Sequence, residues 1–259
     1  ELTYEEYLNF HRTYYHPSNS YIYLYGNMDM EEKLNWLDQE YLSAYDRKEV
    51  DSEIHLQKPF EQMHDITKPY SIASNESTEK LYLAFQILDY ALLSAPGAPI
   101  TKALLEAGIG KDISGSYDSS TYQPIFSIVA KNANEEQKAE FVKVIEDTLK
   151  AIVENGMDKK ALEAGINYHE FRYREADFGG YPKGLMYGLQ IFDSWLYDET
   201  KPFIHVEALD TFAFLKEQIN TGYFEKLIQT YLLDNQHGAL VTIVPEPGRT
   251  ARLDAELKE

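Results

Sequence analysis

The seven histidines are the residues of this chain best suited to metal or acid–base chemistry, and they stand at positions 11, 16, 55, 64, 169, 205 and 237. A catalytic zinc site on a helix needs two histidines with a glutamate beside one of them, in the spacing H-E-x-x-H or H-x-x-E-H. Only His169 is followed by a glutamate, and Tyr173 stands where the second histidine would be needed. We therefore predict no catalytic residue and no metal ligand in this sequence, and it indicates no particular substrate-binding residue. His169 is expected to be structural, and Glu170 to be a solvent-exposed helical carboxylate that pairs with Arg174.

Residues 107–112, Ala-Gly-Ile-Gly-Lys-Asp, resemble part of a phosphate-binding loop. The full motif, G-x-x-x-x-G-K-[ST], would need a glycine in place of Leu105 and a Ser or Thr in place of Asp112. A carboxylate at that point would repel a phosphate. The segment is therefore expected to be the end of a helix that leads into a strand.

Glycines recur at four-residue steps at positions 180, 184 and 188, after Gly179. Such a stripe could associate helices in a membrane. In a chain without a membrane span it favours a turn followed by close packing against a helix. The 21 tyrosines, several of them alternating over residues 21–25, are interpreted as core and sheet-face packing rather than as a platform for stacking a ligand.

Composition excludes several classes of protein. The chain has 259 residues, 44% of them hydrophobic, a formal charge of −19 and no cysteine. These values predict a folded globule, and they exclude a disulfide framework, thiolate metal sites and a cysteine nucleophile; no G-x-S-x-G elbow supports a serine hydrolase. The acidic charge argues against a nucleic-acid partner, and no apolar run reaches the ~18 residues of a membrane span. The start at Glu1 suggests a piece of a longer polypeptide, and without a targeting segment we expect a cytoplasmic protein.

Hydrophobic periodicity and capping residues predict an alternation of helices and strands. Helices are expected over residues 3–15, 29–45, 81–93, 100–107, 134–155, 158–175, 182–195, 206–219 and 223–233, and strands over residues 21–25, 70–73, 114–122, 125–130 and 239–244. The helix over residues 81–93 is apolar on nearly every side and is expected to be buried.

The two ends of the chain resemble each other. A shift of 219 residues places the strand at 21–25 on residues 240–244 without a gap, and Tyr4, Glu6 and Leu8 on Tyr223, Glu225 and Leu227. The shared order of helix, strand and turn suggests two homologous units that end in the same way. The chain would then hold the tail of one unit and one complete later unit.

Several longer blocks resemble insulinase-family (pitrilysin-like) zinc peptidases, in their presequence-protease branch. The blocks are residues 3–7, 15–29, 88–93, 96–99, 103–112 and 122–128. The resemblance covers nearly the whole chain. It implies an α+β fold, a mostly antiparallel sheet with helices packed on one face, repeated along one polypeptide around a chamber that holds peptides.

By this resemblance the chain is a central fragment. Residues 1–45 would end the first, catalytic domain, 46–61 would be a linker, 62–247 a second, non-catalytic domain, and 248–259 the start of a helical hairpin. The family's zinc motif would lie upstream, so zinc would be bound outside this segment, and the fragment alone is predicted to be inactive. The family normally has a further strand between the equivalents of Glu79 and Leu81, whereas here Glu79 and Lys80 lead directly into the helix. Either this domain has lost the strand, or a segment is missing from the sequence.

The expected function is therefore that of a fragment of a zinc metalloendopeptidase that degrades unstructured peptides, with this segment forming part of the substrate chamber. Its partners would be peptide substrates, including basic ones because of the acidic charge, and the rest of the same polypeptide. Two alternatives remain open. One is a catalytically inactive scaffold of the same fold, and the other is an independent peptide-binding module.

Overall fold

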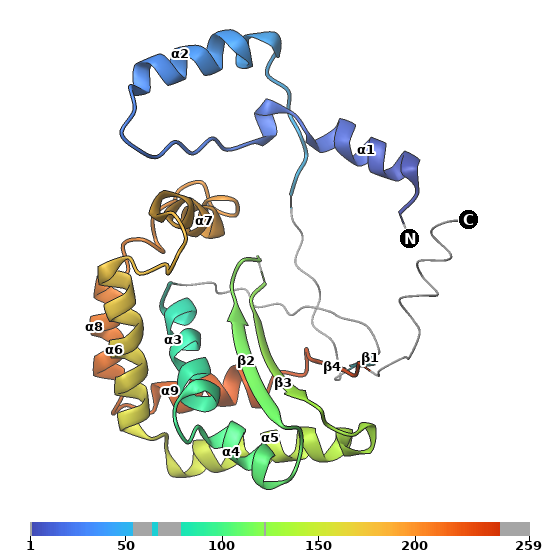
Figure 1. The fold of residues 1–259 in the computed structure, drawn as a ribbon, viewed down its shortest axis with the longest axis vertical. Helices are drawn as coiled ribbons and strands as arrows, with labels where there is room; N and C mark the ends of the chain where they lie inside the picture. The colour runs from blue at the N-terminus through green and yellow to red at the C-terminus, as the bar shows by residue number, and fades with distance from the viewer. Residues whose placement is uncertain (1, 54–63, 67–78, 122, 244–259) are drawn as a thin grey trace. The chain divides into compact units, whose positions relative to one another are not determined.

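The computed structural model of the chain describes residues 2–53, 64–66, 79–121 and 123–243. Contacts divide the chain into two compact units. Unit 1 comprises Glu1–Leu56 and Phe178–Val206, and unit 2 comprises Gln57–Asp177 and Glu207–Glu259. The chain is α+β, rich in helices with short strand pairs (Figure 1). The predicted division into the end of one domain, a linker and a second domain stays a prediction.

Unit 2 contains most of the helices that the sequence predicts. They are α3 (Glu79–Asp89), α4 (Pro99–Glu106), α5 (Lys138–Asn155), α6 (Lys159–Glu175), α8 (Leu209–Gln218) and α9 (Tyr223–Ile228), with a 3₁₀ turn η4 (Glu135–Gln137) and the π turns η3 (Tyr90–Ser94) and η5 (Gln229–Leu233). Their ends follow the expected signals. Asn134 and Gln137 form a capping box before α5, and Gly156 ends that helix with φ +88°.

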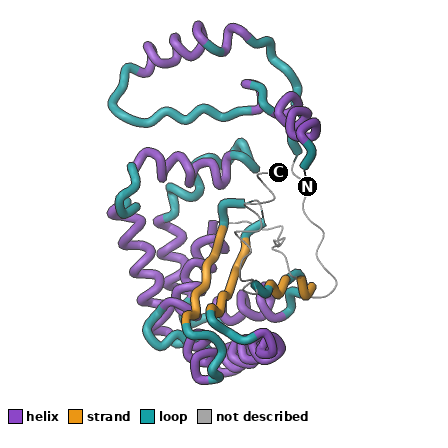
Figure 2. Tube along the Cα trace, turned by 45° about the vertical axis from the view of Figure 1, so that its right-hand side comes forward, coloured by secondary structure: helices purple, strands orange, loops and turns teal. Residues whose placement is uncertain are grey.

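Two strand pairs belong to unit 2 (Figure 2). Strand β2 (Asp112–Asp118) pairs antiparallel with β3 (Ile125–Lys131), the first residue of β2 opposite the last of β3. Strand β1 (His64–Ile66) pairs parallel with β4 (Ala239–Val241). The predicted hairpin is confirmed, although β2 lies earlier in the sequence than expected.

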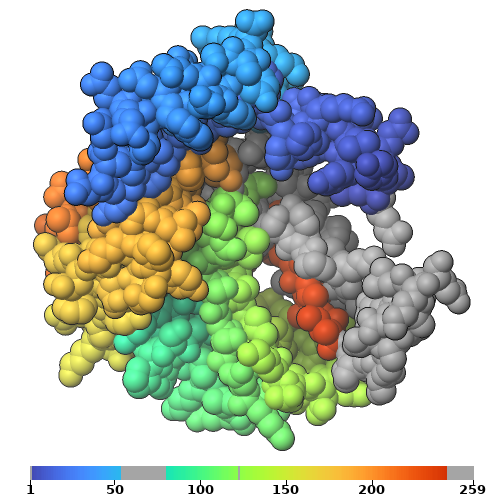
Figure 3. All heavy atoms as spheres, turned by 45° about the horizontal axis from the view of Figure 1, so that its top comes forward, coloured from blue at the N-terminus to red at the C-terminus, as the bar shows by residue number. Residues whose placement is uncertain are grey.

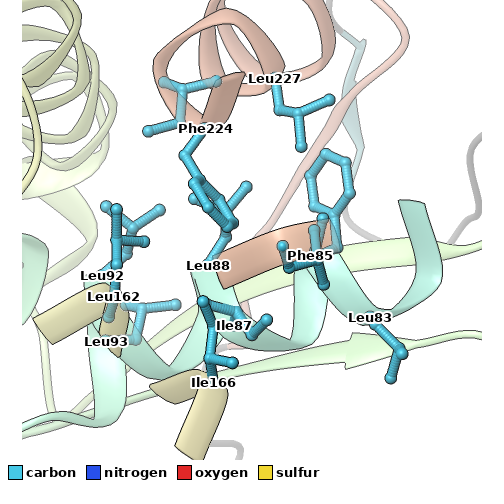
Figure 4. Close-up of a cluster of buried hydrophobic side chains, with 14 of the residues drawn as sticks. Leu83, Phe85, Ile87, Leu88, Leu92, Leu93, Leu162, Ile166, Phe224 and Leu227 are labelled. Atoms are coloured by element: carbon cyan, nitrogen blue, oxygen red, sulfur yellow. The ribbon is translucent and has the colours of Figure 1, made fainter. Parts of the chain in front are cut away.

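The hydrophobic core of unit 2 surrounds α3 and its π turn, as expected for a helix that is apolar on nearly every side. Leu162 and Ile166 of α6 and Phe224 and Leu227 of α9 belong to the same buried cluster (Figure 4). The buried residues of α3 and η3 are Leu83, Ala84, Phe85, Ile87, Leu88, Ala91, Leu92 and Leu93.

Unit 1 contains three helices in its described residues: α1 (Tyr4–Tyr14), α2 (Met30–Glu40) and α7 (Lys183–Trp195). Two short 3₁₀ turns, η1 (Pro17–Asn19) and η2 (Leu42–Ala44), follow α1 and α2. Thr3 and Glu6 form a capping box at the start of α1, and the carboxylate of Asp29 accepts the Glu32 N–H at the start of α2.

The strand predicted over residues 21–25 is wrong, because this described segment has no strand pairing in the described part of the chain. Its tyrosines pack on α7 instead. The Tyr23 ring lies 6.3 Å from the Phe192 ring, and the Tyr21 ring lies 4.6 Å from the Trp195 ring, centroid to centroid. Alternating aromatic residues thus form an extended segment against a helix rather than a strand in a sheet.

The glycines of α7 make this packing possible, which confirms the expected close packing. A Cβ atom at Gly184 would lie 2.0 Å from Tyr25 Cδ1, and one at Gly188 would lie 2.8 Å from Tyr23 Cδ1. Only a residue without a side chain lets the two rings lie this close to the helix backbone.

Some predictions concern residues outside the described part of the chain. These are the strand at 70–73, the latter part of the linker and the start of the hairpin at 248–259. Residues 46–53 of the predicted linker contain no helix or strand. No described helix is both long enough and apolar enough to cross a membrane.

Substitution of Gly184 by alanine tests the packing of Tyr25 on α7. We expect Gly184→Ala to lower the free energy of unfolding by about 1–3 kcal/mol, because the added methyl group collides with the Tyr25 ring. The measurement is chemical denaturation of the chain. Gly180→Ala is the matched control, since a Cβ there meets no atom within 4 Å. Equal stabilities of the two variants would contradict the packing.

Candidate functional site

The histidines do not assemble a metal site in the described part of the chain, where no three His, Asp or Glu residues lie close enough to hold an ion. His16 Nδ1 accepts the Ser18 N–H at 3.1 Å, a role at the start of a 3₁₀ turn. His205 and His237 are buried, with 6% and 1% of their surface exposed. The side chains of His55 and His64 lie outside what the structure describes.

His169 lies on α6 beside the core. Its ring makes edge contacts with the Tyr168 ring at 5.1 Å and the Tyr90 ring at 6.4 Å, centroid to centroid. Burial, together with the nearby Arg172 charge, lowers the pKa of His169 to about 4. The ring is therefore neutral at physiological pH, in surroundings that fit the structural role expected for it.

Glu170 joins α6 to α8. Its carboxylate accepts a hydrogen bond from Arg174 Nη2 at 2.6 Å, which confirms the predicted pair, and a second from Lys216 Nζ. The expectation of a solvent-exposed carboxylate is wrong, since only 13% of the side chain is exposed. The Lys216 hydrogen bond is the largest cause of the lowered pKa of Glu170. Lys216 is 46 residues away, so spacing along one helix could not indicate it.

Residues 107–112 form the expected end of a helix that leads into a strand. Gly108 and Gly110 have φ angles of +71° and +74°. The Lys111 N–H donates to the Lys131 carbonyl at 2.9 Å, and Lys131 Nζ lies 3.0 Å from a carboxylate oxygen of Asp112. The backbone of this loop is thus bound to β3.

A groove of about 890 Å³ lies in unit 2 between β3 and residues 238–243, which include β4. Figure 3 shows open space between the green β2–β3 hairpin and the red residues that precede the grey C-terminal ones. Phe141, Val142 and Ile145 of α5 form one side of the groove. Leu81 and Phe85 of α3 reach it as well.

The groove opens directly onto the hydrophobic core. Phe85 and Leu149 line it and also belong to the buried cluster, with 6% and 4% of their surface exposed. Tyr117 of β2 stacks on Phe85 at 5.3 Å, and burial raises the pKa of its hydroxyl, which stays protonated at neutral pH. Charged side chains in the lining, such as Lys131 and Glu146, are few. This chemistry suits an apolar ligand with a polar backbone rather than acid–base catalysis.

Sequence reasoning did not identify this groove. Its walls come from segments more than 100 residues apart, β3 at Ile125–Lys131 and β4 at Ala239–Val241. The expectation of a further strand near Glu79 came from the resemblance, and it stays a prediction.

Comparison with known proteins gives consistent matches along the chain. A family model described as "Peptidase M16 inactive domain" matches residues 1–168. The chain is 46% identical to "Protein HypA" of Clostridium perfringens over 275 residues, which cover 100% of this chain and 28% of that protein. It is 32% identical to "Presequence protease 1, chloroplastic/mitochondrial" of Arabidopsis thaliana, over 99% of this chain and 26% of that protein.

Two further matches are to a second presequence protease and to a solved structure. The mitochondrial presequence protease of Danio rerio is 27% identical over 100% of this chain and 27% of its own length. The crystal structure of a protein described as a putative M16-like peptidase, from Alicyclobacillus acidocaldarius, is 20% identical with a TM-score of 0.48, covering 86% of this chain and 55% of that one. The chain spans about a quarter of the length of the curated relatives it matches.

Replacement of Glu170 by glutamine tests the link between α6 and α8. We expect Glu170→Gln to lower the free energy of unfolding by about 1–3 kcal/mol at pH 7, because charge-assisted hydrogen bonds to Lys216 and Arg174 are lost. A carboxylate with a lowered pKa stabilises the fold above the ordinary Glu pKa of 4.5, and this contribution is lost as the pH falls through the lowered value. The difference from the unmodified chain should therefore shrink below pH 4.5.

The measurement is denaturation at pH 7 and at several values below pH 4.5. Glu163→Gln, at an exposed position on the same helix, should change stability little at any pH. A difference for Glu170→Gln that stays constant with pH would contradict this account of the carboxylate.

Proposed function

Because the chain belongs to the insulinase (peptidase M16) family and resembles its presequence proteases, we propose that it is a central segment of a zinc-dependent metalloendopeptidase that degrades unstructured peptides. In this proposal the segment forms part of the wall of the substrate chamber and supports the catalytic domain. The observation that carries the proposal is the similarity to proteins named presequence protease over 95–100% of this chain.

The proposal assigns zinc to another part of the whole protein. The described residues do not fit a zinc site, since no group of three His, Asp or Glu residues lies together among them. Zinc, when bound, supplies an activated water for peptide hydrolysis. In this proposal the chain itself contributes a stable packed wall and negative charge, and no catalytic group. Unit 2 supplies a packed core around α3. The formal charge of −19 on the chain would attract basic peptides over a long range.

A second candidate function is a catalytically inactive scaffold or peptide-binding subunit of the same fold. The match to a family model described as an inactive domain is compatible with it. The two candidates differ in the residues that precede this chain in the whole protein, which either contain the zinc motif H-x-x-E-H or lack it.

Peptide cleavage by the full-length protein tests the proposal. We expect an unstructured peptide to be cleaved, a zinc chelator to reduce cleavage to background, and added zinc to restore it. The isolated chain should cleave nothing and bind less than one zinc per molecule. A full-length protein that holds no zinc and leaves the peptide intact would contradict the enzyme and favour the scaffold.

The same assay tests the effect of the acidic charge. A basic peptide should be cleaved faster than an acidic peptide of equal length at low salt, and the difference should narrow as salt screens the attraction. Equal rates for both peptides at every salt concentration would count against a charge-based preference while leaving the peptidase activity itself intact.

A further inference from the structure

We propose that His16 is a pH-sensitive cap which, in its neutral form, fixes the start of the predicted linker to unit 1. The neutral imidazole holds the 3₁₀ turn η1, and η1 in turn binds the backbone at Lys48. When His16 gains a proton, both attachments weaken and the chain that follows η2 is released. This inference concerns unit 1 alone and does not depend on the proposed peptidase activity.

The first argument is the hydrogen bond that the imidazole accepts. His16 directly precedes η1 (Pro17–Asn19), and its Nδ1 accepts the N–H of Ser18 at 3.1 Å. A side chain that accepts a backbone N–H of the first helical residues is an N-cap and stabilises the turn. Only neutral imidazole has a nitrogen that can accept, because both nitrogens carry a proton in the cation. Protonation of His16 therefore removes this cap.

The second argument is that the capped turn binds the linker. The Ser18 hydroxyl accepts the N–H of Lys48 at 3.0 Å, which joins two residues 30 positions apart. Tyr45, directly after η2, contacts the His16 ring in an edge-on arrangement, 5.5 Å between the ring centroids. Residues 46–53 contain no helix or strand. The beginning of this segment is thus attached to unit 1 through His16 and Ser18.

The third argument is that the surroundings of His16 allow it to titrate. Histidine is the side chain that ordinarily changes its charge between pH 5 and 8. His16 is only half-buried, so solvent reaches the ring, and Tyr45 is the titratable residue in contact with it.

Other titratable or charged side chains belong to the two segments that meet at this ring. They are His11, Arg12, Tyr14 and Tyr15 at the end of α1, and Asp46, Arg47, Lys48 and Glu49 after η2. None of them forms a hydrogen bond or ion pair with the imidazole in the described part of the chain. The bond from the Ser18 N–H is therefore the polar contact that protonation breaks.

Amide exchange at several pH values tests the proposal. The protection factors of the Ser18 and Lys48 amides are measured by NMR in the isotope-labelled chain from pH 5 to 8, and the ring chemical shifts of His16 report its protonation in the same samples. We expect both protection factors to fall about fivefold as His16 gains its proton, which is the effect of losing an N-cap. The Tyr7 amide, which donates to the Thr3 carbonyl in α1, should keep its protection.

Three variants separate the parts of this mechanism. Asparagine caps helical turns well and does not titrate, so His16→Asn should keep the Ser18 and Lys48 amides protected at every pH. Ser18→Ala removes the acceptor of the Lys48 N–H, which should exchange fast at every pH, while the amide at position 18 still responds to pH. His11→Asn, at an exposed histidine of α1, is the matched control and should leave the pH dependence unchanged. Circular dichroism checks that all three variants fold.

Three results would overturn the proposal. The first is a His16 ring that stays neutral down to pH 5, or one that gains its proton while the Ser18 and Lys48 amides keep their protection. The second is an equal loss of protection in His16→Asn, which would assign the pH dependence to another group. The third is a response of the Ser18 amide without one at Lys48, which would leave a capped turn that does not control the linker.

Discussion

Burial of α3 is the constraint on which unit 2 depends. A helix that is apolar on nearly every side must be covered on nearly every side, because each buried aliphatic or aromatic side chain contributes roughly 1.5–3 kcal/mol. Helices α6, α8 and α9 and strand β2 all supply residues to the cluster around it. The close approach is visible at Gly115, where a Cβ would lie 2.2 Å from Leu93 Cδ1. Gly115 of β2 is therefore required by the close packing of Leu93, in the π turn that follows α3.

The groove is the place where this covering is incomplete in the described part of the chain. Phe85 is a core residue and also a groove residue, so the same side chain stabilises the fold and faces the site. This explains why the candidate site holds apolar residues and strand edges instead of acids and bases. It also agrees with the match to a family domain described as inactive.

Local signals in the sequence were sufficient for the helices. Caps at Thr3, Asp29 and Asn134 and the stop at Gly156 lie at or next to the expected ends, because each depends on residues within one helical turn. The prediction of a strand at residues 21–25 was wrong for the opposite reason, because a strand depends on a distant partner. An aromatic, β-branched segment becomes a strand only where another strand lies alongside, and the described part of the chain provides α7 there instead.

The groove and the burial of Glu170 also depend on distant partners. Lys216 reaches Glu170 from α8, and β4 meets the groove more than 100 residues after β3. Neither relationship is present in any short window of sequence, whereas the family resemblance, which rests on long blocks, was confirmed by the comparisons.

Hydrogen exchange of the backbone amides of this chain tests most directly whether the core is built on α3 and open along the groove. We predict that amides of α3 around Leu88, which is fully buried, exchange only through global unfolding. Amides of β3 (Ile125–Lys131) that point away from β2 should exchange much faster, through solvent in the groove. Equal protection of the two sets would contradict the account, because it would mean that the free edge of β3 is already covered.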